Sequence, residues 1–128
     1  MIGLDTSAII DIFKGEEAVK KAIEKIEEPL LSTQINYLEI YFGIDPTKHQ
    51  EEAQYYEEFF KEVRPLRLDD KSSRKASELY WKLRKQGKNI GKFDCVIAGI
   101  LLSNGINKIV TRNVKHFENI PGMKAIKY

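Results

Sequence analysis

The sequence has one cysteine, two histidines and four prolines among its 128 residues. Cys95 has no partner for an internal disulfide, which fits a reducing compartment, and we therefore expect a cytoplasmic protein. No apolar run approaches the ~20 residues of a membrane span, and no charged-then-apolar leader opens the chain. These absences argue against a disulfide-stapled secreted domain and predict a protein that does not associate with membranes.

The chain also lacks a strong charge of one sign and a glycine-rich phosphate loop. Lys and Arg number 21 against 19 Asp and Glu, so the net charge is +2 and does not by itself indicate a nucleic-acid-binding protein. No glycine-rich turn follows the first apolar run, which argues against a dinucleotide or P-loop site there. With 42% hydrophobic and 31% charged residues, the composition predicts a single soluble domain spanning residues 1–128.

Short apolar runs alternate with helical periodicity along the whole chain. This alternation predicts an α/β fold in which helices cover both faces of a central, mainly parallel sheet of four to five strands. The expected helices are residues 6–14, 16–26, 34–42, 49–62, 69–85 and 93–103. The expected strands are Ile2–Leu4, Leu30–Ser32, Pro65–Leu68, Lys108–Val110 and Met123–Ile126.

Three carboxylates stand in unusual surroundings. Asp5 ends the first strand, where α/β sheets build their sites, whereas Glu39 and Asp94 interrupt helices that are apolar on most sides. Each has a purely structural explanation: a helix cap for Asp5, a first-turn acid for Asp94 and a narrow solvent stripe for Glu39. Together they predict a shared site at one sheet edge, where carboxyl oxygens converge on Mg²⁺ or Mn²⁺ and the cation relieves their repulsion.

The segment after the 108–110 strand should reach the same edge. Thr111 and Asn113 lie one and three residues beyond Val110. Asn113 either makes a turn or supplies an oxygen ligand or substrate contact. His116 follows in the same segment and is interpreted as a loop histidine.

Several motifs resemble those of the PIN-domain family, specifically VapC-type toxin ribonucleases. They are LDTSAIIDIFKG at the start, NYLEIYFGI in the middle, and FDCVIAGI followed by IVTRNVKHFENIPGM. The resemblance covers essentially the whole chain. It implies a compact three-layer α/β/α domain that hydrolyses RNA phosphodiester bonds with Mg²⁺ or Mn²⁺.

The resemblance also implies roles for individual residues. Asp5, Glu39 and Asp94 correspond to the catalytic, metal-holding acids of the family, and Thr6 and Thr111 to hydroxyls that support them. The family often has a fourth acid after the fourth strand, and here Asn113 stands there as a weaker possible ligand. Asp11 also matches a frequent family residue, and its spacing from Asp5 suggests a helix surface or partner contact. The implied partners are RNA, a VapB-like antitoxin and a second copy in a homodimer.

Substrate capture requires cations near the acids. Lys82, Arg84, Lys85, Lys88 and Lys92 precede Asp94, while Arg112 and Lys115 flank Asn113. We interpret Lys92, Arg112 and Lys115 as RNA-phosphate contacts, the alternative being a solvated face. Tyr80 and Trp81 are candidates for base stacking, although core packing is the preferred interpretation.

An apolar surface for a protein partner is also available. The aromatic side of the 49–62 helix and the early helices carrying Ile9, Ile12, Phe13 and Val19 form it, although such stripes more often belong to a core.

Three other functions fit parts of the sequence. A PIN-fold RNA-processing nuclease outside a toxin–antitoxin pair would need the same acids. A non-catalytic PIN binding module is suggested by Asn113 and opposed by the three acids. A receiver-like phosphoacceptor domain is suggested by Asp69 and Asp70 after the third strand, but the first strand supplies only Asp5 rather than an acid pair.

Overall fold

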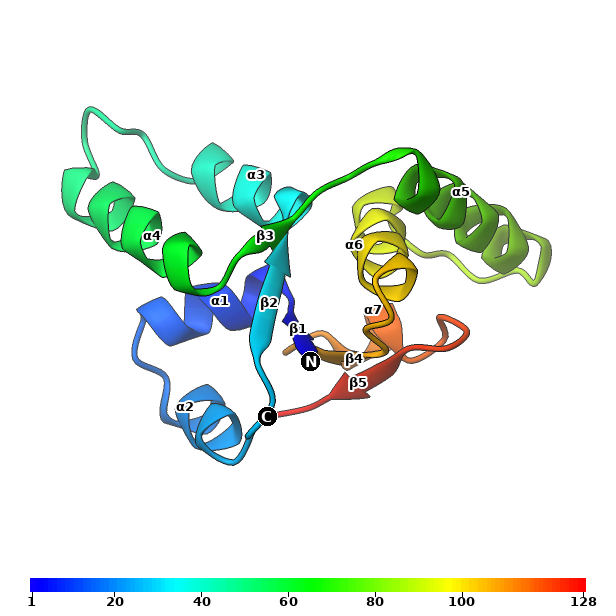
Figure 1. The fold of residues 1–128 in the computed structure, drawn as a ribbon, viewed down its shortest axis with the longest axis horizontal. Helices are drawn as coiled ribbons and strands as arrows, with labels where there is room; N and C mark the ends of the chain where they lie inside the picture. Colours follow the sequence, from blue (N-terminus) through cyan, green and yellow to red (C-terminus); the bar gives the residue numbers. More distant parts are fainter.

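Five short strands form one parallel sheet in the computed structural model, which describes residues 1–128 (Figure 1). Their spatial order is β3-β2-β1-β4-β5. In the central strand, Gly3 pairs with Leu31 on one side and Ile109 on the other. The predicted fold class is thereby confirmed. The strands are β1 (Ile2–Leu4), β2 (Leu30–Thr33), β3 (Pro65–Leu66), β4 (Lys108–Val110) and β5 (Lys124–Ile126).

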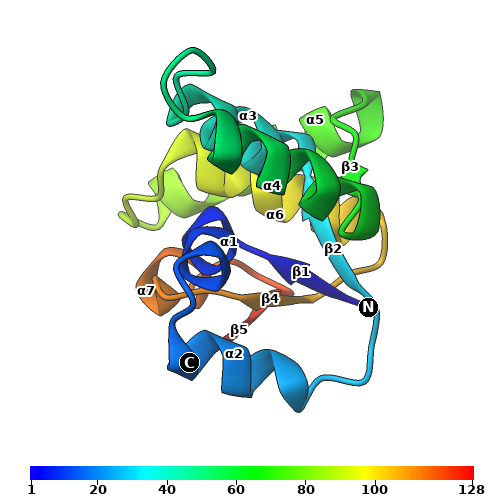
Figure 2. The same ribbon diagram turned by 90° about the vertical axis from the view of Figure 1, so that its left-hand side faces the viewer.

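Helices cover both faces of the sheet. One core cluster joins α1, α2 and α4 to residues of β1 and β4, and the other joins α5 and α6 to Ile109 and Phe117. Figure 1 shows these groups on opposite sides of the strands, and Figure 2 shows α2 and α4 from the side. The helices are α1 (Thr6–Phe13), α2 (Glu17–Glu24), α3 (Gln34–Phe42), α4 (Gln50–Glu62), α5 (Asp70–Lys85), α6 (Lys92–Ser103) and α7 (Val114–Phe117).

Two elements differ from the sequence-based expectation. The third strand pairs only through Pro65–Leu66, and Leu68 beyond it is 45% exposed. Because β3 is an edge strand, it tolerates a proline that cannot donate to a neighbour. The segment after β4, expected as a loop, contains the short helix α7.

The carboxyl ends of β2, β1 and β4 meet at one edge of the sheet. The Asp5 N–H donates to the Val110 carbonyl at 2.9 Å, which ties the start of α1 to the end of β4. On the other side of β1, the Thr33 hydroxyl accepts the Asn36 N–H and caps α3. Parallel pairing thus brings residues 5–7, 33–39 and 111–113 together.

Close packing of α5 on α6 depends on Gly99. A Cβ added there would lie 2.8 Å from the Ala76 backbone nitrogen and 2.9 Å from its Cα. We expect Gly99→Ala to lower the free energy of unfolding by about 1–3 kcal/mol, measured by urea unfolding, because backbone cannot yield without separating the helices.

Gly43→Ala is the matched control, since its added Cβ would meet nothing closer than the carbonyl oxygens of Ile40, at 3.4 Å, and Glu39, at 3.8 Å. We expect a change within about 0.5 kcal/mol. Equal losses in the two variants would show that the α5–α6 contact is not the limiting one.

Candidate active site

Asp5 is held in place by two hydroxyl groups. Its side chain is 5% exposed, and its Oδ2 accepts hydrogen bonds from Ser7 Oγ and Thr111 Oγ1, both at 2.9 Å. Although Asp5 occupies the cap position of α1, its carboxylate makes no capping hydrogen bond. The structure therefore gives this carboxylate no helix-capping role and turns it toward the edge of the sheet. Ser7 was not assigned a role from the sequence.

The Glu39 carboxylate is linked by hydrogen bonds, through Thr6 of α1, to Asn36 of its own helix α3. The Asn36 amide donates to Thr6 Oγ1 at 2.9 Å, and Thr6 Oγ1 donates to Glu39 Oε1 at 2.8 Å. Asn36 is fully buried and also forms a capping box with Thr33. The Thr33-x-x-Asn36 spacing signals the cap, but the second hydrogen bond of Asn36 has no signature in the sequence. Thr6 thus lies against Glu39, whereas the family resemblance implies only that its hydroxyl supports the acids.

Asp94 lies in the first turn of α6 and faces a histidine from α7. Its Oδ2 is 3.1 Å from Nδ1 of His116, and its side chain is 22% exposed. The interpretation of His116 as a loop histidine is wrong, because the residue belongs to α7. The helix α7, absent from the sequence-based expectation, carries the imidazole to this carboxylate.

The three acids line one pocket and influence one another. Burial raises the pKa of Glu39, and the charges of Asp5 and Asp94 raise it further. Burial also raises the pKa of Asp94, opposed by His116 and supported by the charge of Asp5. The pocket is lined by residues of α1, α3, α6 and the segment after β4, chiefly Asp5, Thr6, Glu39, Phe93, Asp94 and Asn113.

The carboxylates nevertheless do not form a ready-made metal cage. No three acidic, histidine or cysteine side chains are arranged around one point at ligand distance, which differs from the expectation that the acids already converge. Each acid is turned to its own donor, namely Thr111 for Asp5, Thr6 for Glu39 and His116 for Asp94. Their oxygens suit a hard divalent cation, whose charge would offset their mutual repulsion after side-chain rotation.

The segment after β4 is clamped to α1. Thr111 is fully buried and accepts the Asn113 N–H at 2.9 Å, and Ser7 Oγ accepts the Arg112 N–H at 3.1 Å. Asn113 lines the acidic pocket, and its side chain makes no cap to α7. Asn113 is therefore placed beside the acids rather than used as a cap.

Asp11 is buried rather than on a helix surface. It is 3% exposed, its Oδ1 accepts Nη1 of Arg112 at 3.0 Å, and its Oδ2 accepts the Tyr128 hydroxyl. The surface interpretation of Asp11 is therefore wrong. Burial and the neighbouring Asp11 carboxylate raise the pKa of Tyr128. Arg112 is predicted to bind RNA, but its Nη1 already donates a hydrogen bond to Asp11 within the protein.

The remaining predicted RNA-binding residues lie at the rim. Lys92 and Lys115 are exposed, and neither takes part in a salt bridge. Lys115 lines a hollow next to the acidic pocket together with Asn113 and His116. These positions flank the acids on the α6 and α7 sides.

The raised pKa of Glu39 predicts a stability effect with a definite sign. A carboxyl whose pKa is raised above its ordinary 4.5 by folding destabilises the fold once ionised. We therefore expect Glu39→Gln to unfold at a higher urea concentration than the parent near pH 7. The difference should shrink at about pH 4, where the parent is protonated too. A less stable variant near pH 7 would show that the hydrogen bond from Thr6 outweighs burial and repulsion.

The model of the family described as PIN domain matches residues 2–123. The chain belongs to the PIN domain family. The VapC-type resemblance is confirmed as well, and the receiver-like alternative is excluded. Two tRNA(fMet)-specific endonucleases named VapC are similar, one from Shigella flexneri (26% identical; 95% of this chain, 93% of the relative) and one from Salmonella typhimurium (25%; 94% and 92%).

Solved structures of other PIN domain proteins have the same fold. VapBC2 from Rickettsia felis, solved bound to a DNA fragment from its promoter, superposes with a TM-score of 0.86 at 22% identity, covering 100% of this chain and 99% of that one. VapBC-1 from nontypeable Haemophilus influenzae gives 0.82 at 25% identity, covering 99% and 98%. The similarity therefore extends over the full sheet and all helix layers.

Proposed function

We propose that this PIN domain protein is a divalent-metal-dependent endoribonuclease and the toxin of a type II VapBC pair. The observation that carries the proposal is the gathering of Asp5, Glu39 and Asp94 in one pocket, where burial and the charge of Asp5 raise the pKa values of Glu39 and Asp94. The VapC relatives are named as RNA endonucleases, and the superposed structures are VapBC complexes.

The mechanism follows from the donors around each acid. Mg²⁺ or Mn²⁺, held by Asp5, Asp94 and Glu39 with Asn113 as a weaker ligand, would neutralise phosphate charge and lower the pKa of water. Thr111 and Ser7 orient the Asp5 carboxylate by donating to its Oδ2. Neither hydroxyl donates to Oδ1. One of the carboxylates lining the pocket would also accept the proton of the attacking water.

Cleavage of a mixed-sequence RNA with and without Mn²⁺ tests this function. The parent should cut RNA with Mn²⁺, should stop when EDTA is added, and should resume when Mn²⁺ is restored in excess. Asp5→Asn keeps the shape of the side chain and should be inactive under all three conditions. An absence of Mn²⁺-dependent cutting by the parent, or equal Mn²⁺-dependent cutting by Asp5→Asn, would contradict the proposal.

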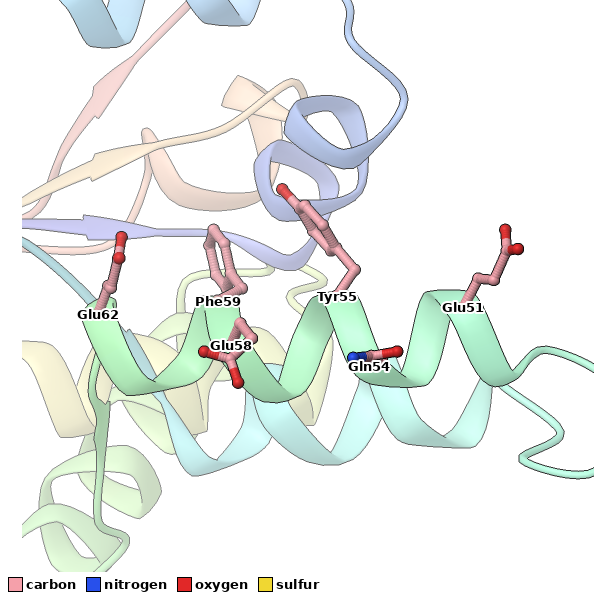
Figure 3. A pocket seen from close by; sticks show the side chains of 6 residues that line it. All are labelled: Glu51, Gln54, Tyr55, Glu58, Phe59 and Glu62. Carbon is pink, nitrogen blue, oxygen red and sulfur yellow. The ribbon is translucent and has the colours of Figure 1, made fainter.

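The proposed antitoxin surface is on α4. The rings of Tyr55 and Phe59 extend from this helix toward α1, and acidic side chains border them (Figure 3). Of the apolar residues suggested for this surface, Ile9 and Val19 are fully buried and belong to the core. The remaining surface of α4, formed by Tyr55, Phe59 and the glutamates beside them, suits a partner segment that is both apolar and basic.

We propose a cytoplasmic homodimer. None of the helices combines the length and hydropathy needed to cross a membrane.

Phosphate contacts at the rim predict a change in salt dependence. We expect Lys92→Ala and Lys115→Ala each to weaken RNA binding and to reduce the log–log salt slope by about 0.7 for single-stranded RNA. Mn²⁺ affinity should not change, because both side chains lie outside the acid cluster. Binding should be titrated in EDTA at several salt concentrations. If both variants keep the salt slope of the parent, these lysines do not contact RNA phosphates and form only a solvated face.

A non-catalytic binding module is the second candidate, favoured by the neutral Asn113 and by His116 beside Asp94. RNA binding without cleavage in Mn²⁺ would support it. A PIN-fold nuclease acting outside a toxin–antitoxin pair would cleave RNA but bind no antitoxin-like partner through α4.

A further inference from the structure

The carboxylates of Asp5 and Glu39 are each held through one of their two oxygens. Ser7 and Thr111 donate to Oδ2 of Asp5. Thr6 donates to Oε1 of Glu39. No group of the protein donates to the second oxygen of either acid, and neither second oxygen is sealed from water. Hydroxyl donors therefore fix both side chains and leave one oxygen of each accessible.

Asp94 has the same arrangement with a different donor. Its Oδ2 lies 3.1 Å from Nδ1 of His116, which is hydrogen-bonding distance, and no group of the protein donates to its Oδ1. Gly91 borders the same Oδ2, since a Cβ added to this glycine would lie 3.4 Å from it. Oδ2 is thus enclosed by His116 and Gly91, whereas Oδ1 has no protein partner.

The core places both residues of this pair. Asp94 precedes Cys95 and His116 precedes Phe117, and these two buried neighbours belong to one core cluster. The His116 N–H also donates to the Asn113 carbonyl at 2.9 Å, at the start of α7. The imidazole itself is 54% exposed, so burial of the ring does not explain its position. The anchored backbone of α7 brings it to Asp94.

The contact has little to offer folding but much to offer a metal site. An ion pair so accessible to water contributes little stability. Carboxylates that ligate a metal are themselves hydrogen-bonded, and these partners orient them toward the cation. We propose that His116 is a positioning residue of the acidic pocket, whose Nδ1 holds Oδ2 of Asp94 and leaves Oδ1 for a divalent cation. This inference rests on the proposed metal-dependent function and adds a residue to its site.

The role requires only an N–H at Nδ1, which a neutral imidazole can carry as well as an imidazolium. Variants that place the side-chain nitrogen differently therefore test it. The amide nitrogen of asparagine can occupy the place of Nδ1, whereas that of glutamine matches Nε2. His116→Ala and His116→Gln should bind Mn²⁺ about 10- to 100-fold more weakly than the parent, and His116→Asn should retain most of the affinity. The paramagnetic resonance signal of free Mn²⁺ measures this affinity without RNA.

His49→Ala is the matched control for the loss of a histidine. Nδ1 of His49 accepts the Asp45 N–H at 3.2 Å in the turn before α4, and this residue does not line the acidic pocket. The control variant should bind Mn²⁺ as the parent does. Urea unfolding provides the second readout: the midpoints of the His116 variants should match that of the parent, because the ring is exposed. A purely structural role would move the midpoint and leave the Mn²⁺ affinity of the folded protein unchanged.

Mn²⁺-dependent cleavage by the parent separates this inference from the proposed function. If the parent binds Mn²⁺ and cleaves RNA but the His116 variants bind Mn²⁺ equally well, the positioning role is overturned and the nuclease stands. A loss in His116→Asn as large as in His116→Ala would also overturn it. Tighter binding by His116→Ala would do so too, because the imidazole would then compete with the cation for Asp94. A parent that binds no Mn²⁺ would overturn both the proposed function and this inference.

Discussion

Replacing Asp94 by asparagine is expected to slow Mn²⁺-dependent RNA cleavage by on the order of 10³-fold or more. A cation at such a site contributes several kcal/mol of charge stabilisation, and each ~1.4 kcal/mol is tenfold in rate. Folding should survive, because the lost partner, His116, is 54% exposed and an ion pair so accessible to water contributes little. Single-turnover cleavage and urea unfolding of the same preparation measure the two effects.

Asn113→Ala is the matched comparison at the same pocket. Asn113 is neutral, so it adds a hydrogen bond or a weak ligand but little attraction for a cation. We expect about a tenfold loss of cleavage, at the low end of the ~10- to 100-fold range of groups that support a metal site. A loss as large as that of Asp94→Asn would make Asn113 the equivalent of the family's fourth acid. Asn113→Asp should tighten Mn²⁺ binding if its side chain turns toward the acids.

Arg112→Ala is expected to lower the free energy of unfolding by about 2 kcal/mol, since a hydrogen bond to a buried charged group contributes about 1.5–3 kcal/mol. The variant leaves the Asp11 carboxylate, 3% exposed, with only the Tyr128 hydroxyl. The exposure of the Arg112 side chain, 57%, places the value in the lower part of that range. Urea unfolding with linear extrapolation provides the measurement.

Lys115→Ala is the control for removal of a nearby cation. Lys115 is exposed and unpaired, and its loss should change stability by less than about 0.5 kcal/mol. Adding Asp11→Asn to Arg112→Ala should cost less than the sum of the single changes, because the charge left without its partner is then gone. Additive losses would show that Arg112 and Asp11 are not energetically coupled.

The pairing of Arg112 also bears on its predicted contact with RNA. The Arg112 side chain also ties the 111–113 segment to α1 through its hydrogen bond to Asp11. A loss of RNA binding in Arg112→Ala therefore has two physical sources, a lost phosphate contact and a displaced segment. Lys92 and Lys115, which have no such internal partner, are the cleaner test of phosphate binding.

The sequence by itself determined the sheet and the identity of the three acids. The alternation of short apolar runs with helical periodicity predicts a parallel α/β fold, and parallel strands bring residues after Leu4 and Val110 to one edge. Glu39 and Asp94 stand out because carboxylates are rare in such apolar helices. These inferences depend on local patterns, which a single sequence displays directly.

The tertiary structure alone decided how the side chains around the acids are paired. Asp11 and Arg112 are 101 residues apart, and Thr111 and Asp5 are 106 apart. No periodicity links residues so distant, so Asp11 resembles a surface residue until Arg112 and Tyr128 are brought to it. His116 reaches Asp94 only because a helix of four residues, too short to leave a pattern, turns it inward. The exposure of Trp81 and Phe93 is likewise decided by which helix faces meet, and this depends on packing over the whole chain.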